Sequence, residues 1–161
     1  MLIAVISILL LVIGAGLTFY SATYGAVVAF LGLCAVGLIP GVELGVPVFI
    51  FWAVAIAIVV TLGFILPKAV TASRLGVTYI VMGALAGMLV GLALSHAAMI
   101  IGSVIGALLG GVAFARTPAG KALTFPSPRF WNYLCAKGLP AVISFAIIGT
   151  AIPVLVSWLT R

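Results

Sequence analysis

Charged side chains are the scarcest class in this chain. They make up 5% of its 161 residues, whereas 66% of the residues are hydrophobic. A soluble domain carries about a quarter charged residues, so this composition excludes an ordinary globular protein. The apolar runs are continuous and long enough to cross a bilayer as helices, whereas a membrane β-barrel would alternate apolar with polar residues. The sequence therefore predicts an all-α, polytopic transmembrane bundle that forms a single membrane domain over residues 1–161.

Acidic, histidine and cysteine side chains are nearly absent. The chain has one carboxylate (Glu43), one imidazole (His96) and two thiols (Cys34 and Cys135). Metal sites need clusters of these side chains, and enzymes that work inside the bilayer need several polar groups together. We therefore expect no metal, no cofactor and no catalytic residue, and we predict that the protein is not an enzyme. Cys34 falls in an apolar span and Cys135 in a connection, which predicts free thiols rather than a disulfide.

Six membrane spans account for the apolar runs. The predicted spans are residues 2–19, 22–39, 46–66, 76–94, 97–115 and 139–159. The first lacks the basic start of a signal peptide, so we expect it to be a retained helix. Pro40 and Gly41 are expected to close the second span, and Pro67 the third.

Six of the seven basic residues fall in connections that a six-span chain places on one side of the membrane. These cations are Lys68, Arg74, Arg116, Lys121, Arg129 and Lys137. Because basic loops stay in the cytoplasm, this bias predicts a bacterial inner-membrane protein with both termini outside the cytoplasm. The cations form no continuous run, and we expect no nucleic-acid partner.

The connection 116–138 mixes aromatic with basic side chains. Ser127 and Pro128 form a helix-start signal, and Gly138 and Pro140 form a stop signal. These signals predict a short helix that lies in the cytoplasmic headgroup layer. Its expected interfacial anchors are Arg129, Trp131, Tyr133 and Lys137. Lipid anchoring is the favoured role, and a docking surface for a protein partner is the alternative.

Two glycine ladders step by four residues in the fourth and fifth spans, which puts each ladder on one helix face. The ladders are Gly83, Gly87, Gly91 and Gly102, Gly106, Gly110. A hairpin that turns near His96 and Ala97 would bring Gly83 level with Gly110, Gly87 with Gly106 and Gly91 with Gly102. Small residues let membrane helices approach closely. The pattern predicts a tight antiparallel hairpin held by a glycine zipper.

Three residues are weak functional candidates. The lone carboxylate of Glu43 raises a proton-relay or cation-site hypothesis, but an exposed loop residue is the favoured interpretation. His96 lies at the hairpin tip, where a pH sensor is conceivable and a plain polar turn residue is favoured. Pro153 and Gly149 interrupt the sixth span, as in the broken helices of transporters, although a tolerated kink is commoner.

A resemblance to a known family is carried by the stretch that runs from Ile65-Leu66-Pro67 through Arg74-Leu-Gly76 and both ladders to Gly110. In this stretch and in its Pro40-Gly41 turn the chain resembles a bacterial family catalogued as domain of unknown function 456. The resemblance implies a small polytopic membrane protein with glycine-rich paired spans, and it implies no activity. The chain differs from the expected pattern after the second ladder, where Gly111-Val-Ala-Phe-Ala stands in place of an acidic residue.

These patterns predict a non-enzymatic integral membrane protein. The leading hypothesis is a small transporter of a lipid-linked or hydrophobic small molecule. The alternative is an accessory subunit that scaffolds a membrane complex, and a membrane enzyme is the least favoured class. Membrane lipids are the expected partners, and a homo-oligomer or a partner membrane protein stays open.

Overall fold

The protein is a bundle of helices. The computed structural model describes residues 2–65 and 74–160, and the regular secondary structure in these residues is helical throughout. The elements are α1 (Leu2–Tyr20), α2 (Ala22–Gly37), α3 (Val46–Ile65), α4 (Arg74–Leu92), α5 (His96–Ala115), the 3-10 helix η2 (Pro118–Leu123), α6 (Pro128–Tyr133), the π-helix η3 (Leu134–Gly138) and α7 (Leu139–Leu159). The predicted helical bundle is confirmed. Pro67 and Lys68, which belong to the predicted third connection, lie outside the described residues.

Five helices are long and apolar enough to cross a membrane. They are Leu2–Tyr20, Val46–Ile65, Leu75–Leu92, His96–Ala115 and the continuous helix Pro128–Leu159. They are compatible with a multi-pass membrane protein. Many of their large apolar side chains face outward, such as Val12 at 64% and Val90 at 69% exposure. A surface of this kind suits lipid and is unusual for a soluble monomer.

The helix of the second span is shorter than predicted. Its helix, α2, has 16 residues and ends at Gly37 rather than at residue 39. At 1.5 Å per residue it measures about 24 Å, against about 30 Å for the hydrocarbon core. The cause is Pro40, because a proline disfavours helical geometry in the residue before it. Leu38 and Ile39 form tighter turns instead, with N–H groups that donate to Ala35 and Val36 carbonyls.

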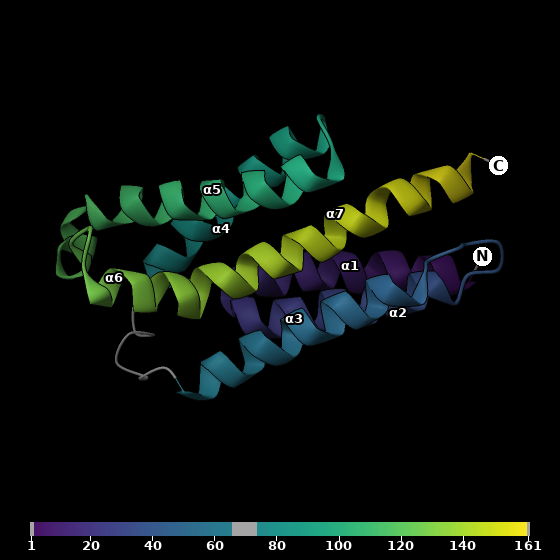
Figure 1. Cartoon of the computed structure of the whole chain (residues 1–161), viewed down its shortest axis with the longest axis horizontal. Coiled ribbons are helices and arrows are strands. Elements are labelled where there is room, and N and C mark those ends of the chain that lie inside the picture. The colour runs from purple at the N-terminus through teal and green to yellow at the C-terminus, as the bar shows by residue number, and fades with distance from the viewer. Residues whose placement is uncertain (1, 66–73, 161) are drawn as a thin grey trace.

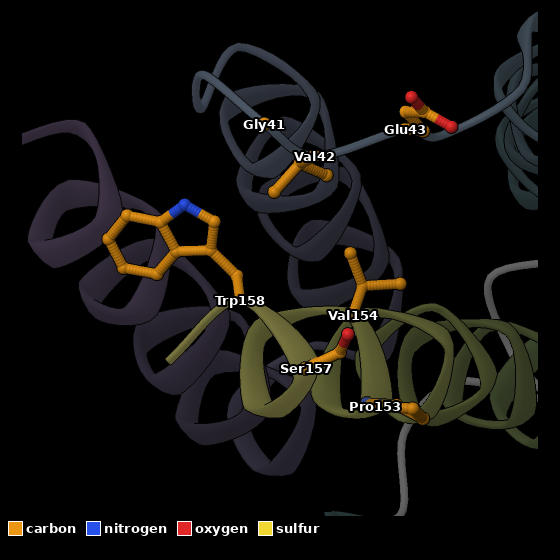
Figure 2. Close-up of a pocket in the computed structure, with 7 residues that line it drawn as sticks. All are labelled: Gly41, Val42, Glu43, Pro153, Val154, Ser157 and Trp158. Atoms are coloured by element: carbon orange, nitrogen blue, oxygen red, sulfur yellow. The ribbon is translucent and has the colours of Figure 1, made fainter. Parts of the chain in front are cut away.

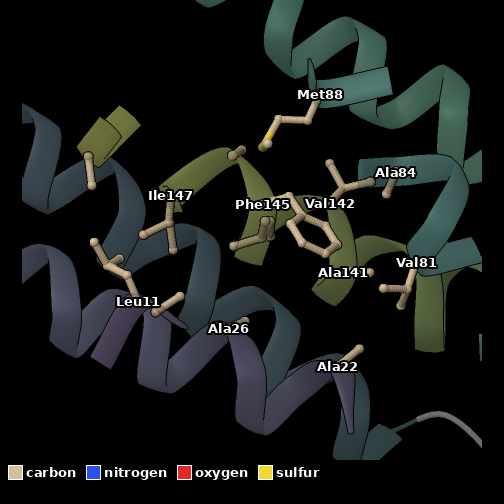
Figure 3. Close-up of a cluster of buried hydrophobic side chains, with 14 of the residues drawn as sticks. Leu11, Ala22, Ala26, Val81, Ala84, Met88, Ala141, Val142, Phe145 and Ile147 are labelled. Carbon is tan, nitrogen blue, oxygen red and sulfur yellow. The ribbon is translucent and has the colours of Figure 1, made fainter. Parts of the chain in front are cut away.

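Helix α7 lies between two helical hairpins, α1–α2 and α4–α5 (Figure 1). It contacts each of α1 to α5, and every residue from Pro140 to Ile147 is buried. Its Val142 and Phe145 pack toward α4, while Ile147 packs toward Leu11 of α1 (Figure 3). The core of the bundle is therefore built around α7, the last helix in the chain.

A buried polar contact crosses this core. The hydroxyls of Thr18 on α1 and Ser144 on α7 lie 2.7 Å apart, and both side chains are fully buried. The Thr18 hydroxyl also donates to the Gly14 carbonyl at 2.8 Å. If Ser144 donates to Thr18, both hydroxyls use their hydrogens, so the pair ties α1 to α7 without an unsatisfied group.

The α1–α2 hairpin is closed by small residues that the sequence analysis did not single out. Ser21 alone joins the two helices. A Cβ atom at Gly14 would come within 2.8 Å of the Ala29 backbone N, and one at Gly25 would overlap Thr18. Gly32 likewise faces Leu11. The two residues of each pair lie equally far from the Ser21–Ala22 bond along the chain. The α1–α2 hairpin therefore shows the same mirror spacing of small residues that predicted the α4–α5 hairpin.

The α4–α5 hairpin brings backbone against backbone at the ladders. A Cβ atom at Gly83 would overlap the Gly106 carbonyl oxygen, and one at Gly87 would overlap that of Gly102. The predicted partners lie in contact as well, since the same atom at Gly83 would come within 3.3 Å of the Gly110 Cα, so Gly83 packs between two glycines of the other ladder. The turn itself lies earlier than predicted. Ser95 accepts a hydrogen bond from the Ala98 N–H at 3.0 Å and caps α5, so His96 belongs to the helix and the turn comes before it.

The predicted stop at Gly138 and Pro140 is wrong, because α6, η3 and α7 form one continuous helix. Pro140 has no N–H to donate to the carbonyl four residues earlier. The chain absorbs this with a π-turn, in which the Leu139 N–H donates to the Leu134 carbonyl five residues back. The whole helix of 32 residues measures about 48 Å. We therefore treat α7 as the spanning part and residues 116–138 as lying outside the hydrocarbon.

Candidate functional site

A pocket at the end of α7 unites two of the three weak candidates. It has a volume of about 400 Å³ and is lined by Gly41, Val42, Glu43, Pro153, Val154, Ser157 and Trp158 (Figure 2). We call it the α7 pocket. Glu43 comes from the α2–α3 connection and Pro153 from α7, so residues 110 positions apart in the sequence form one site. The sequence gives no sign of this pairing, because it depends on how α7 packs against α2.

Two features hold the α2–α3 connection over α7. Gly41 has a φ of +87°, a conformation that favours glycine, and it lets the chain turn after Pro40. The indole N–H of Trp158 donates to the Pro40 carbonyl at 3.1 Å. Trp158 was not among the sequence candidates. Its signal was its place near the end of the last span, where tryptophan is common at membrane interfaces.

The α7 pocket combines several kinds of chemistry. The Glu43 side chain is exposed at the connection, and the Ser157 hydroxyl lies on the last turns of α7. Val42, Pro153 and Val154 form apolar walls (Figure 2). Pro153 lies inside α7 and has no N–H for the Gly149 carbonyl, yet the helix continues through it to Leu159. The site therefore offers one negative charge, one hydroxyl and an aromatic ring beside aliphatic surface.

His96 is separate from this pocket. It is the first residue of α5, its side chain is exposed, and it does not line the α7 pocket. The structure therefore joins Glu43 and Pro153 but leaves His96 at the α4–α5 turn.

A second cavity runs along the outer side of the α4–α5 hairpin. We call it the α4–α5 groove. Its volume is about 680 Å³, and its lining is apolar. It is lined by all six ladder glycines together with Ala86, Val90, Leu94, Ala98, Ile101, Ile105, Leu109 and Ala113. Because glycine carries no side chain, the ladders form the floor of the groove and the larger side chains form its walls.

Basic side chains lie beyond one end of the α4–α5 groove. Ala113 lines that end, and Arg116 follows three residues later on the same side of the helix. Arg116 is exposed, as are Lys121 and Arg129 in the connection that follows. The groove therefore leads from apolar surface to a positively charged end of the bundle.

The four predicted interfacial anchors divide into two kinds. Arg129 is exposed, and Trp131 is 46% exposed. Tyr133 is 1% exposed, because its ring stacks on Phe114 with centroids 6.1 Å apart and its hydroxyl lies against Gly76. Tyr133 therefore packs inside the protein rather than against lipid, which corrects its predicted role, and this burial raises its pKa to about 12. Lys137 is half-buried, and its burial lowers the pKa of the ammonium.

The described residues hold no group of three or more His, Cys, Asp or Glu side chains that could bind a metal. Cys34 and Cys135 are both free thiols.

Comparison of the chain with protein-family models, with curated proteins and with solved structures finds no match. The resemblance to domain of unknown function 456 therefore stays a prediction that rests on the motifs quoted above.

Proposed function

We propose that the protein is a small membrane carrier for a lipid-linked or hydrophobic small molecule. The observation that carries this proposal is the α4–α5 groove, which offers about 680 Å³ of apolar space on the outer surface of the hairpin. A hydrocarbon chain suits such a groove, since its lining has almost no polar group to satisfy. The carrier would hold the chain of its substrate against the glycine floor.

The length of the groove supports movement across the membrane rather than binding in one leaflet. Its lining on α5 runs from Ala98 to Ala113. At 1.5 Å per residue this covers about 22 Å. One leaflet contributes only about 15 Å of the roughly 30 Å hydrocarbon core. A chain that slides along the groove would therefore pass the bilayer midplane while it stays in contact with apolar side chains.

The charge distribution supports an anionic head group and a defined orientation. Arg116 stands beyond the Ala113 end of the groove, where a phosphate would find a cation. Both chain ends lie at the opposite end of the bundle (Figure 1). We propose that the basic end faces the cytoplasm of a bacterium and that both termini lie outside it, since cytoplasmic loops are enriched in Lys and Arg.

Transport assays in liposomes test the carrier function. Purified protein should accelerate the movement of a fluorescent anionic phospholipid between leaflets. Ala86→Phe should reduce this rate by at least half, because Ala86 is exposed in the groove and a benzyl group would fill it. Ala57→Phe is the matched control, since Ala57 is exposed on α3 and does not line the groove. Equal rates for liposomes with and without folded protein would contradict the carrier function.

A scaffolding role is the second candidate, and α3 favours it. Only Trp52 and Val59 of the 20 residues of α3 are buried, so most of this helix presents apolar surface. Purification from native membranes in a mild detergent tests this role. A membrane protein that co-purifies in constant ratio, together with flat transport traces, would support the scaffold and reject the carrier.

A further inference from the structure

We propose that the α7 pocket binds an organic ammonium ion. The proposal goes beyond the carrier function, because it concerns a different site and a ligand of the opposite charge. It rests on three features of the pocket: a carboxylate with no partner among the described residues, an aromatic ring held in place and aliphatic walls.

The carboxylate of Glu43 is free to meet a cation. It is the only acidic side chain among the 161 residues, and among the described residues the structure gives it no hydrogen bond or ion pair. The described basic residues all lie toward the far end of the bundle, at the start of α4 and in the 116–138 connection (Figure 1). They are Arg74, Arg116, Lys121, Arg129 and Lys137. No described cation therefore competes for Glu43. An exposed carboxylate of this kind attracts positive ligands over a range of about 10 Å at ordinary salt.

The indole of Trp158 supplies a second element of cation recognition. Its N–H is already bonded to the Pro40 carbonyl, so the ring is held in the wall of the pocket (Figure 2). The face of a tryptophan ring attracts ammonium groups more strongly than that of the other aromatic residues. Glu43 and Trp158 thus bring a full negative charge and a cation–π surface to one cavity.

The remaining walls select the class of cation. Val42, Pro153 and Val154 present aliphatic carbon, and Ser157 adds one hydroxyl. Small metal cations prefer several oxygen ligands at once, which this lining does not offer. An ammonium with alkyl substituents matches the lining better, since its methyl or methylene groups contact the walls while its charge meets Glu43. The volume of about 400 Å³ falls in the range of small-molecule sites.

Binding of choline and of its uncharged isostere, 3,3-dimethylbutan-1-ol, tests the proposal on the full chain. The protein is held in a maltoside detergent, whose head group carries no ammonium, and binding is followed by saturation-transfer NMR at pH 7. We expect choline to bind in the millimolar range and at least threefold more tightly than the alcohol. Equal binding of the two probes, or no binding of choline to folded protein at 100 mM, would overturn the proposal.

Variants assign the binding to the pocket. Glu43→Gln should raise the choline Kd about threefold to fivefold and reduce the preference over the alcohol by the same factor. Trp158→Leu should raise the choline Kd by a similar factor, while Trp158→Phe, which keeps a ring but loses the bond to Pro40, should lie between Leu and wild type. His96→Gln is the matched control, because His96 is exposed outside the pocket. Wild-type binding by Glu43→Gln, or a His96→Gln effect as large as that of Glu43→Gln, would reject the site.

The outcome is independent of the carrier function. Ala86→Phe fills the α4–α5 groove and leaves the α7 pocket intact, so it should bind choline like the wild type. If Ala86→Phe loses lipid movement but still binds choline, the α4–α5 groove is separate from the choline site. If Glu43→Gln loses choline binding but still moves lipid, the choline site is not needed for lipid movement.

Discussion

At the scale of single residues, the glycines of this chain differ in what a methyl group would meet. A Cβ atom at Gly87 would overlap the Gly102 carbonyl oxygen, and one at Gly106 would overlap that of Gly83. Backbone cannot move aside as the end of a flexible side chain can. Gly16 on α1, by contrast, has no atom within 4 Å of the same position. The ladder spacing already separated Gly87 and Gly106 from Gly16 in the sequence, and the backbone contacts give the physical reason.

The first prediction follows from this difference. Gly87→Ala and Gly106→Ala should each destabilise the protein by about 1–3 kcal/mol, because an added methyl group must push α4 and α5 apart. Gly16→Ala is the control and should be neutral or stabilising by up to about 1 kcal/mol. Thermal unfolding in detergent, followed by circular dichroism, measures the three variants. Wild-type stability for both ladder variants would contradict the backbone contact.

A second residue-scale prediction concerns the buried hydroxyl pair. Thr18→Val and Ser144→Ala each remove one partner of the 2.7 Å contact between α1 and α7. In a double-mutant cycle the coupling energy should be about 0.6 kcal/mol and at most about 1.7 kcal/mol, as for other hydrogen bonds between membrane helices. Ser7, which bonds only to the Ile3 carbonyl of its own helix, gives the control pair Ser7→Ala with Ser144→Ala. A coupling near zero for Thr18 and Ser144 would show that the pair contributes nothing to packing.

At the scale of elements, the part of the fold that follows from local pattern was predictable and the part that follows from packing was not. The helices appear where long apolar runs occur, and the α4–α5 hairpin appears where two glycine ladders face each other. The turn of that hairpin lies before His96 rather than at His96 and Ala97, since Ser95 caps α5. The α1–α2 contact was missed because its glycines face Thr18, Ala29 and Leu11 rather than other glycines, although the paired positions mirror each other as those of the ladders do.

The π-helix η3 gives a third prediction, on Lys137. Burial lowers the pKa of this ammonium, so the folded state releases its proton at lower pH than the unfolded state, whose pKa is near 10.5. At neutral pH the folded state therefore carries a desolvated charge, which lowers the free energy of unfolding. This penalty disappears as pH rises through the lowered pKa, so stability increases there. Lys137→Met should be as stable as the wild type or more so at pH 7, and the wild type should gain on it toward pH 10.

The control for Lys137 is arginine, which keeps its charge throughout this range. Lys137→Arg should show no gain in stability relative to Lys137→Met between pH 7 and pH 10. Thermal unfolding of the three proteins at several pH values measures the effect. A wild type that loses stability relative to Lys137→Met as pH rises would give the opposite sign and reject the burial penalty.

At the scale of the whole molecule, the candidate site was harder to predict from the sequence than the helices were, because it is formed by contacts between distant elements. Glu43 and Pro153 were each visible in the sequence as unusual residues, but the pocket that joins them also needs Trp158. No local pattern places the α2–α3 connection over the end of α7. The same holds for Tyr133, which is typical of an interfacial anchor by sequence and is buried because its ring packs on Phe114 of α5. Periodicity finds elements, whereas contacts between distant elements define sites.

The orientation of the whole bundle gives the last prediction. In Figure 1 the 116–138 connection lies at one end of the molecule and both chain ends lie at the other, so one labelled position at each end determines the topology. Cys34 and Cys135 are replaced by serine, and Lys121→Cys or His96→Cys is added to this background, since both positions are exposed. In intact bacterial cells a membrane-impermeant maleimide should label His96→Cys and should reach Lys121→Cys only after the cells are opened.

The reverse pattern would invert the bundle. It would place the basic end beyond Ala113 outside the cytoplasm, against the enrichment of cytoplasmic loops in Lys and Arg. Labelling of both positions in intact cells would mean that the polypeptide crosses the membrane an even number of times between them, and it would remove α5, the one long helix between them, as a spanning helix.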